Sequence, residues 1–216
     1  MKIRIITVER EYGSGGAAIA ERLANRLGWQ LWDRDLTSEI AREAKVTREA
    51  VHRCDERVDP LISRLFSVYA RGSYERTLPV TETRHFNTDA MVAMLHKVIE
   101  QVASKGECVI VGRGSPYILR SRPDAFHVFI YAPDDEKLRR LRNIGQSEKE
   151  SLQLIQEVDR ERASFIRHYF HKEWPHRPLY NLMINSKFGD DYVVETILRN
   201  IAALENLRES EGAKAS

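Results

Sequence analysis

A glycine-rich segment, Gly13-Ser14-Gly15-Gly16, follows closely on an apolar run near the start of the chain. A strand that turns through glycines into a helix exposes backbone amides at the positive end of the helix dipole, and glycine lets a polyanion approach the main chain. The segment is therefore a candidate phosphate cradle. The strict phosphate-loop pattern, Gly, four residues and Gly-Lys-Ser/Thr, is not met, because Arg10 stands at its first glycine, Gly16 at its lysine and Ala17 at its hydroxyl. Taken alone, the segment fits both a phosphate site and a simple glycine-rich corner.

Charged side chains follow two further apolar runs. Asp33 and Arg34 come directly after a short run over 30–32, and Arg113 lies between two glycines after the run Cys108–Val111. The carboxyl ends of parallel strands meet at one edge of a sheet, where open α/β sheets bind their ligands. We therefore expect these residues to lie beside the glycine-rich segment. The chain has 25 Arg and 9 Lys, and this bias also indicates phosphate chemistry, because the planar fork of arginine matches phosphate oxygens.

A predicted long helix carries a second group of charged residues. It begins at Ser147, where Ser-Glu-Lys-Glu forms a capping box, and runs to about His171. Its apolar stripe contains Arg162, and an arginine buried without a partner is very costly. Two interpretations stay open: Arg162 meets an anion, or its stem packs while its head reaches solvent or pairs with Asp159 or Glu161.

The elements that must position these residues alternate between strand and helix. Amphipathic helices are expected over about 15–27, from about Asn87, from Asp134 and from Ser147. This alternation is typical of a parallel sheet covered by helices on both faces, so the predicted fold class is α/β. The five expected strands are 3–8, 30–32, 108–111, 126–131 and 180–185.

One domain is expected over residues 1–206, with a core formed by 1–34 and 107–206. The region 35–106 contains no convincing strand and is predicted to be a helical insertion that binds an acceptor. Residues 207–216 are rich in Glu, Ser, Lys and Gly, which predicts a disordered tail.

The composition excludes several classes of protein. Hydrophobic residues make up 42% and charged residues 31% of the chain, which is typical of a globular protein. Basic and acidic residues number 34 and 32, so no bulk positive charge favours nucleic acid or an anionic membrane. The chain has no apolar stretch long enough to span a membrane, and its two cysteines cannot form a disulfide framework. We expect a cytoplasmic protein that binds small molecules, and nothing in the sequence indicates its oligomeric state.

Five segments together resemble a known family. In order they are Glu-Arg-Glu-Tyr-Gly-Ser-Gly-Gly from Glu9, then Asp33, Val-Ile-Val-Gly-Arg-Gly from Val109, Phe-Ile-Tyr-Ala-Pro from Phe129, and Asp-Arg-Glu-Arg from Asp159. With them the chain resembles the cytidylate kinase-like family, relatives of bacterial cytidylate kinase among the phosphate-loop nucleoside monophosphate kinases. The resemblance spans about residues 3–203. It implies a phosphate-loop kinase fold with an acceptor lobe, an arginine-bearing lid, and ATP phosphates over Gly13, Ser14, Gly15, Gly16 and Ala17.

The resemblance implies a role for each charged segment on the acceptor side. Asp33 and Arg34 match a place near the acceptor, where relatives have an Asp, and Arg113 matches an arginine on the acceptor phosphate. Asp159 and Arg162 fall in a run that contacts the acceptor sugar and phosphates in relatives.

On the ATP side the resemblance implies further roles. Glu9 stands where relatives have an Asp before the glycine loop, and it could order magnesium-bound water. Arg142 belongs with Arg140 to the arginine-bearing start of the lid and is expected to contact ATP. The loop lacks the lysine, the magnesium-binding hydroxyl and the arginine that the family usually has at position 17. We expect the missing charge to come from arginines that close on the transferred group. These are Arg10, Arg113, Arg139, Arg160 and Arg162.

The predicted function is transfer of the γ-phosphoryl group of ATP, with Mg²⁺, to a nucleoside monophosphate or a similar small acceptor. The resemblance suggests CMP or dCMP. The alternative is a nucleotide-binding module with little catalysis, because the loop lysine and hydroxyl are missing. A nucleic-acid-binding α/β domain is disfavoured by the near-neutral charge.

Overall fold

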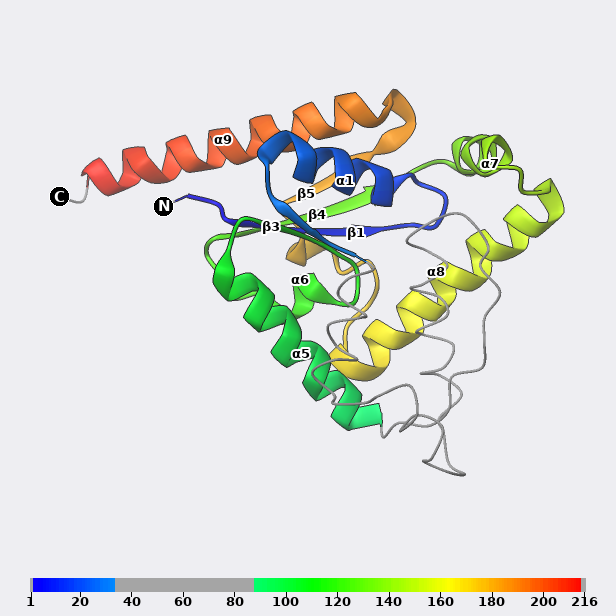
Figure 1. Cartoon of the computed structure of the whole chain (residues 1–216), viewed down its shortest axis with the longest axis horizontal. Helices are drawn as coiled ribbons and strands as arrows, with labels where there is room; N and C mark the ends of the chain where they lie inside the picture. Colours follow the sequence, from blue (N-terminus) through cyan, green and yellow to red (C-terminus); the bar gives the residue numbers. More distant parts are fainter. Residues whose placement is uncertain (1, 34–87, 215–216) are drawn as a thin grey trace.

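The fold is built on one sheet of five parallel strands. The structure is a computed structural model of the chain, and it describes residues 2–33 and 88–214. The strand order is β2-β3-β1-β4-β5, and every neighbouring pair is parallel (Figure 1). The predicted α/β class and the five-stranded parallel sheet are confirmed. The strands are β1 (Ile5–Arg10), β2 (Gln30–Trp32), β3 (Cys108–Val111), β4 (Ala125–Tyr131) and β5 (Leu182–Asn185).

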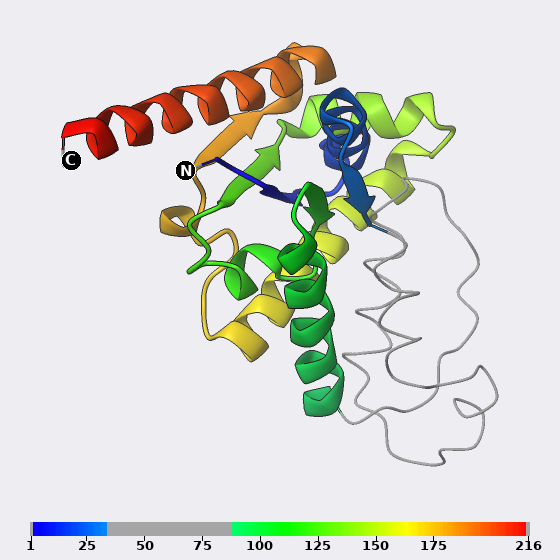
Figure 2. The same ribbon diagram turned by 60° about the vertical axis from the view of Figure 1, so that its left-hand side comes forward.

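Helices cover both faces of this sheet. On one face α1 (Gly16–Leu27) packs beside α9 (Asp190–Lys214) (Figure 1). The other face carries α5 (Thr88–Lys105), α6 (Ser115–Ile118) and α8 (Glu148–Phe170), as Figure 2 shows from another side. α7 (Asp134–Asn143) lies beyond the carboxyl ends of the strands and packs against α8. Two 3-10 turns, η1 (Arg177–Leu179) and η2 (Ser186–Phe188), flank β5.

β1 is the central strand, and its alternating side chains divide the core in two. Ile6 and Val8 pack in the cluster formed with α1 and α9, whereas Ile5 packs in the cluster formed with α5 and α8. A strand that is buried on both faces favours such a β-branched run. The last two residues of β1 are charged, and yet Glu9 is 0% and Arg10 is 1% exposed. Because a charge is costly to bury, these two buried charges indicate that charge has a role at the carboxyl end of β1.

The chain order of the strands reverses at β1. After β1 the chain moves to one side of it and forms β2 and β3, and it then crosses to the other side and forms β4 and β5. Open α/β sheets bind ligands outside the carboxyl ends of the strands where the strand order reverses in this way. The glycine-rich loop after β1 and Arg113 after β3 therefore reach the same edge, as the sequence predicts.

The end of the chain differs from its prediction. The disordered tail predicted over 207–216 is wrong for the part that the structure describes, because α9 continues to Lys214. Most residues after Asn206 are good helix formers, and two long-range contacts hold the helix in place. Arg208 Nη1 donates to the Pro123 carbonyl at 2.8 Å, and Glu205 Oε1 accepts from the Ile3 amide at 2.6 Å. The polar composition therefore reflects an exposed helix surface.

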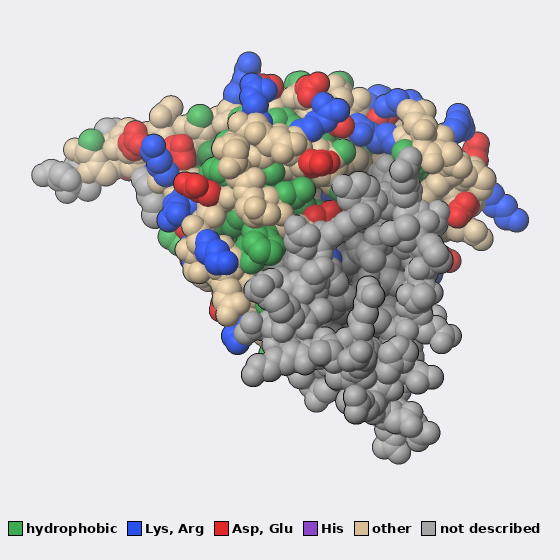
Figure 3. All heavy atoms as spheres, viewed as in Figure 1, with side chains coloured by type: hydrophobic (Ala, Val, Ile, Leu, Met, Phe, Trp, Pro, Cys, Tyr) green, Lys and Arg blue, Asp and Glu red, His purple; other side chains and the backbone are tan. Residues whose placement is uncertain are grey.

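Most of the predicted insertion lies outside the described residues, as does Arg34. Its last predicted helix is present as α5, with Leu95, Val98 and Val102 buried. Within 2–33 and 88–214, none of the helices combines the length and the apolar character that crossing a membrane requires. Figure 3 shows basic and acidic side chains interspersed over the described part of one face.

The buried His127 generates a prediction about pH. His127 Nδ1 lies 2.7 Å from Thr7 Oγ1, and burial lowers the pKa of its imidazole to about 4. Between pH 4 and the ordinary value near 6.5, the unfolded chain binds a proton that the folded chain does not, so stability falls as the pH falls through this window. A depression of this size corresponds to about 3 kcal/mol in the free energy of unfolding.

The measurement is urea unfolding of the wild type and His127→Gln at about pH 7 and about pH 4.5. The wild type is expected to lose about 2 kcal/mol more than the variant on acidification. The comparison between the two proteins is needed because burial raises the pKa of Glu9, which contributes the opposite slope to both. Equal pH dependence of the free energy of unfolding in the two proteins would show that His127 does not cause the loss of stability.

Candidate active site

The loop between β1 and α1 leaves the start of a helix open. Gly15 is the N-cap of α1, adopts the left-handed φ of 76°, and has no side-chain cap. The first N–H groups of an α-helix have no partner within the helix, so they and the helix dipole are available to an anion. The Ser186 hydroxyl donates to the Ser14 carbonyl at 2.7 Å, and the Ser14 hydroxyl donates to the Glu11 carbonyl at 2.8 Å. These bonds fix the shape of the loop.

Two side chains of α8 hold the other side of this loop. Asp159 Oδ1 accepts a hydrogen bond from the Tyr12 amide at 2.9 Å. Arg162 Nη1 donates to the same Asp159 oxygen at 2.9 Å and to the Arg10 carbonyl at 2.8 Å. The two residues lie one helical turn apart, so both reach the same point beside the sheet. The structure therefore joins Asp159 and Arg162 to the glycine-rich loop.

Arg162 is fully buried and only partly satisfied. Its side chain is 0% exposed, and among the described residues its Nε and Nη2 have no hydrogen-bond partner. A buried donor left without a partner costs about 1–3 kcal/mol, and more when it is charged. Of the interpretations of the sequence, the head that reaches solvent is wrong and the pairing with Asp159 is observed. The remaining N–H groups also suit an anion.

Glu9 lies beneath the loop as a buried carboxyl group. Its Oε1 accepts from the Gly114 amide at 3.3 Å and its Oε2 from Trp174 Nε1 at 3.4 Å. Burial raises the pKa of Glu9, and the charges of Arg10 and Arg162 partly oppose that rise. Both oxygens thus already have protein donors.

Arg113 is positioned by the turn after β3. It adopts a left-handed φ of 58°, which is unfavourable for a side chain with a Cβ atom and indicates a functional constraint. The side chain is buried, and its Nη2 donates to the Asp33 carbonyl at 3.2 Å. The structure therefore brings Asp33 and Arg113 together, as the argument from strand ends expects. Their roles toward an acceptor stay predictions.

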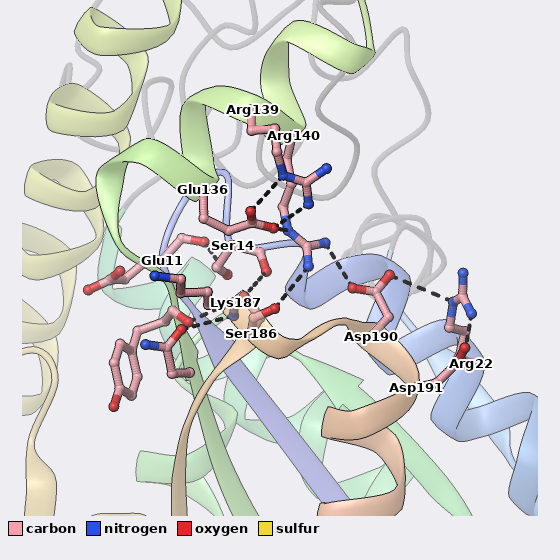
Figure 4. Close-up of polar contacts among 12 residues, drawn as sticks. Glu11, Ser14, Arg22, Glu136, Arg139, Arg140, Ser186, Lys187, Asp190 and Asp191 are labelled. Carbon is pink, nitrogen blue, oxygen red and sulfur yellow. Dashed lines mark hydrogen bonds and ion pairs between the residues drawn. The ribbon is translucent and has the colours of Figure 1, made fainter.

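Of the three arginines of α7, the structure places Arg140 on the loop. Its guanidinium is 14% exposed and bonds Glu136, Asp190 and the Ser186 carbonyl at 2.8 to 3.1 Å (Figure 4). A Cβ atom on Gly15 would overlap this guanidinium, so the loop and Arg140 are in direct contact. The sequence could have singled out Arg140 only through the buried face of α7, because three neighbouring arginines give the same local signal.

The other two arginines of α7, and Arg160, lie farther from the loop. Arg139 is 60% exposed and pairs with Glu136 at 2.6 Å. Arg142 is 66% exposed and pairs with Glu148 at 3.1 Å. Arg160 is exposed on α8, and no contact within the described residues joins it to the loop. Neighbouring arginines of α7 point in different directions, and the roles expected for Arg139, Arg142 and Arg160 stay predictions.

Lys137 lies over Gly13 and was not among the residues predicted from the sequence. Its Nζ pairs with Glu11 at 2.8 Å and with Asp134 at 3.3 Å, and the side chain is 7% exposed. Burial lowers the pKa of this ammonium group, but Glu11, Asp159 and Asp134 together outweigh burial and the pKa is raised. The signal was its spacing of four residues from the buried Leu141, which puts both on the inner face of α7.

A pocket of about 390 Å³ opens beside Arg140. This volume lies within the range of small-molecule sites. Arg22, at its edge, pairs with Asp191 at 2.8 Å (Figure 4). The pocket lies between α1, α7 and the start of α9, and its lining includes Gly15, Ala18, Arg22, Arg139, Arg140 and Asp190.

Comparison with known proteins agrees with this fold. The model of the cytidylate kinase-like family matches residues 5–188. An uncharacterized protein from Eubacterium ventriosum has a similar structure, with 22% identity, a TM-score of 0.67, and coverage of 93% of this chain and 99% of the other. A gluconokinase from Sinorhizobium meliloti aligns with 18% identity and a TM-score of 0.52, over 97% of this chain and 99% of its own. No curated protein matches the chain significantly. These structural likenesses support the fold.

The link between α8 and the loop generates a prediction. Asp159→Ala removes the acceptor of the Tyr12 amide and leaves Arg162 buried without its carboxylate. Breaking a buried pair in this way costs about 3–5 kcal/mol. Urea unfolding measures the loss, with Glu157→Ala, at an exposed position of the same helix, as the control. The double variant Asp159→Ala/Arg162→Met is expected to recover part of the loss, and no recovery would contradict the pairing.

Proposed function

Because the chain belongs to the cytidylate kinase-like family, we propose that it is an ATP-dependent phosphotransferase. Its acceptor is a nucleoside monophosphate or a similar small molecule, with CMP and dCMP as the first candidates. The observation that carries the proposal is the buried Arg162, which has unsatisfied N–H groups and is bonded to the Arg10 carbonyl at the end of β1, where the chain enters the loop to the uncapped start of α1. A polyanion is the ligand that suits both features.

ATP fits one side of the loop. Its phosphates would lie at Gly15 and Gly16, where no side chain caps the start of α1. Its nucleoside would occupy the pocket of about 390 Å³ between α1, α7 and α9. Arg140, at the boundary between loop and pocket, would contact the phosphates.

The acceptor fits the other side of the loop. Arg113 and Asp33 lie at the ends of β3 and β2, away from the pocket that α7 and α9 line. An acceptor phosphate bound to Arg113 would approach the loop from that side. Arg162 is bonded to the Arg10 carbonyl, at the end of β1 between the two. Positioning of this kind supplies most of the catalysis in phosphoryl transfer.

The reaction itself needs little covalent chemistry from the protein. An oxygen of the acceptor phosphate forms a bond to the γ-phosphorus, the bond from that phosphorus to the oxygen bridging to the β-phosphate breaks, and ADP leaves. Negative charge is spread over the transferred group during this step. Arg162 and Arg113 are fixed in position before the reaction, so they would stabilise that charge without reorganisation.

The described residues do not fit a magnesium ion held by the protein. Position 17 is alanine and offers no hydroxyl, and both oxygens of Glu9 accept protein hydrogen bonds. No group of three or more His, Cys, Asp or Glu residues that could hold a metal occurs within 2–33 and 88–214. Magnesium would therefore arrive on the phosphate oxygens of ATP, and we assign no step to it.

A second function is favoured by two observations. Arg140 is already bound by Glu136 and Asp190, and the phosphate-loop pattern lacks its lysine at position 16 and its hydroxyl at position 17. These features would also suit a protein that binds a nucleotide and transfers its phosphate slowly or not at all.

A transfer assay distinguishes the two functions. With Mg-ATP and a panel of nucleoside monophosphates, diphosphate formation is expected for at least one acceptor. Arg113→Ala is expected to raise the acceptor KM and to lower kcat/KM by about 10²-fold or more, because one fixed donor is lost. Arg199→Ala, at an exposed position of α9, is the control. ATP binding without any transfer would select the binding module, and absence of ATP binding would overturn both.

The ATP side generates a separate prediction. Arg140→Gln is expected to weaken ATP binding about tenfold or more, because a hydrogen bond to a charged group contributes about 1.5–3 kcal/mol. Arg26→Gln is the matched control, since Arg26 is 63% exposed on α1 and pairs only with Glu195 in the described part of the chain. Isothermal titration calorimetry measures both. Equal affinity of the two variants would remove Arg140 from the ATP site.

A further inference from the structure

The position that holds the lysine in the strict phosphate-loop pattern has no room for a side chain here. A Cβ atom on Gly16 would lie 2.5 Å from Arg10 Cβ and 2.8 Å from Arg10 Cγ. Both atoms are next to the main chain of Arg10, so they cannot swing aside as the end of a long side chain can. The main chain of Arg10 is itself fixed, because it pairs with Ile130 in β4 and its carbonyl accepts from Arg162. A side chain at position 16 and the side chain of Arg10 therefore exclude each other.

At positions 10 and 16 the chain departs from the strict phosphate-loop pattern in opposite ways. The pattern has glycine at the position of Arg10 and lysine at the position of Gly16. Each version of the loop thus has one cationic side chain and one glycine, in exchanged places. The two versions differ in where the cationic side chain is attached. In the strict pattern it belongs to the first turn of the helix, and in this chain it belongs to the end of β1.

The buried location of Arg10 supports a charge function at this place. Its side chain is 1% exposed, and its charge lowers the pKa of the neighbouring Glu9 against the effect of burial. Its Cβ and Cγ atoms lie against Gly16 in the first turn of α1, which no side chain caps. A guanidinium stays charged in any environment, and its fork can bind two phosphate oxygens at once.

We propose that Arg10 and Gly16 form an exchanged cation–glycine pair, in which Arg10 contacts the phosphates of ATP in place of the loop lysine. The inference rests on the proposed function. It makes Arg10 a catalytic residue and explains why position 16 is glycine. Of the five arginines that the sequence predicts to supply the missing charge, it selects Arg10 as the replacement for the loop lysine.

The test is to move the cationic side chain from position 10 to position 16, where the strict phosphate-loop pattern has its lysine. Arg10→Gly is expected to weaken Mg-ATP binding about tenfold or more, because it removes the loop cation. Gly16→Lys alone introduces the overlap and is expected to lower the melting temperature of the ligand-free protein. The double variant Arg10→Gly/Gly16→Lys is expected to recover ATP affinity to within about threefold of the wild type, a coupling that independent sites do not show.

A matched control separates position from charge. Arg10→Gly/Ala18→Lys places an equal charge two residues further along the same turn, at an exposed position. This variant is expected to remain as weak as Arg10→Gly. If the double variant with Gly16→Lys binds no better than Arg10→Gly while the wild type binds ATP, or if the Ala18 control recovers equally, the inference is overturned.

Two further comparisons keep the test decisive if a variant is too unstable to assay. Arg10→Met retains most of the side-chain volume and Arg10→Lys retains the charge, so only the first is expected to lose ATP affinity and kcat. Without any nucleotide, Gly16→Ala is expected to lower the melting temperature more in the wild type than in the Arg10→Gly background. Equal losses would disprove the overlap. A wild type that binds no ATP would overturn the proposed function and the role of Arg10 with it, and this melting comparison would still report on the overlap.

Discussion

One buried ion pair connects the long helix α8 to the loop on which the candidate site depends. Asp159 binds the amide of Tyr12, Arg162 binds the carbonyl of Arg10, and the two side chains bind each other. A single carboxylate–guanidinium pair thus fixes the main chain on both sides of Glu11. Such a pair is costly to desolvate and is stable only where hydrogen bonds satisfy its atoms. Two nitrogen atoms of Arg162, Nε and Nη2, lack that compensation within the described residues, and an anion would supply it.

α7 is joined to the same loop by ion pairs, which makes ligand binding a competition. Lys137 binds Glu11, and Arg140 binds Glu136 and Asp190 beside Gly15. An incoming phosphate must take Arg140 from these carboxylates or share it with them. The measured affinity is then the difference between two sets of charge pairs, and it is smaller than the contacts of the bound state alone would suggest.

The arrangement of strands was predictable, whereas the choice among neighbouring charges was not. Runs such as Cys108–Val111 are apolar and short enough to identify a buried strand, and strand ends then place Asp33 and Arg113 at one edge. Arg140 could not be separated from Arg139, because both belong to one charged run and only the packing of α7 against α8 decides which faces the loop. The same holds for α9 after Asn206, where the bond from Arg208 to the distant Pro123 carbonyl helps to hold a segment of polar composition in a helix.

The mutual exclusion of side chains at positions 10 and 16 also constrains how such a loop can change over time. A lineage that passes from one version to the other by single substitutions must go through a loop with two glycines or through a loop with two crowded side chains. If Arg10 is the loop cation, as proposed, the first intermediate keeps its fold and loses affinity for ATP, whereas the second strains the start of α1. Interconversion is therefore expected to pass through intermediates with two glycines. Because either intermediate carries a cost, the two versions should rarely interconvert.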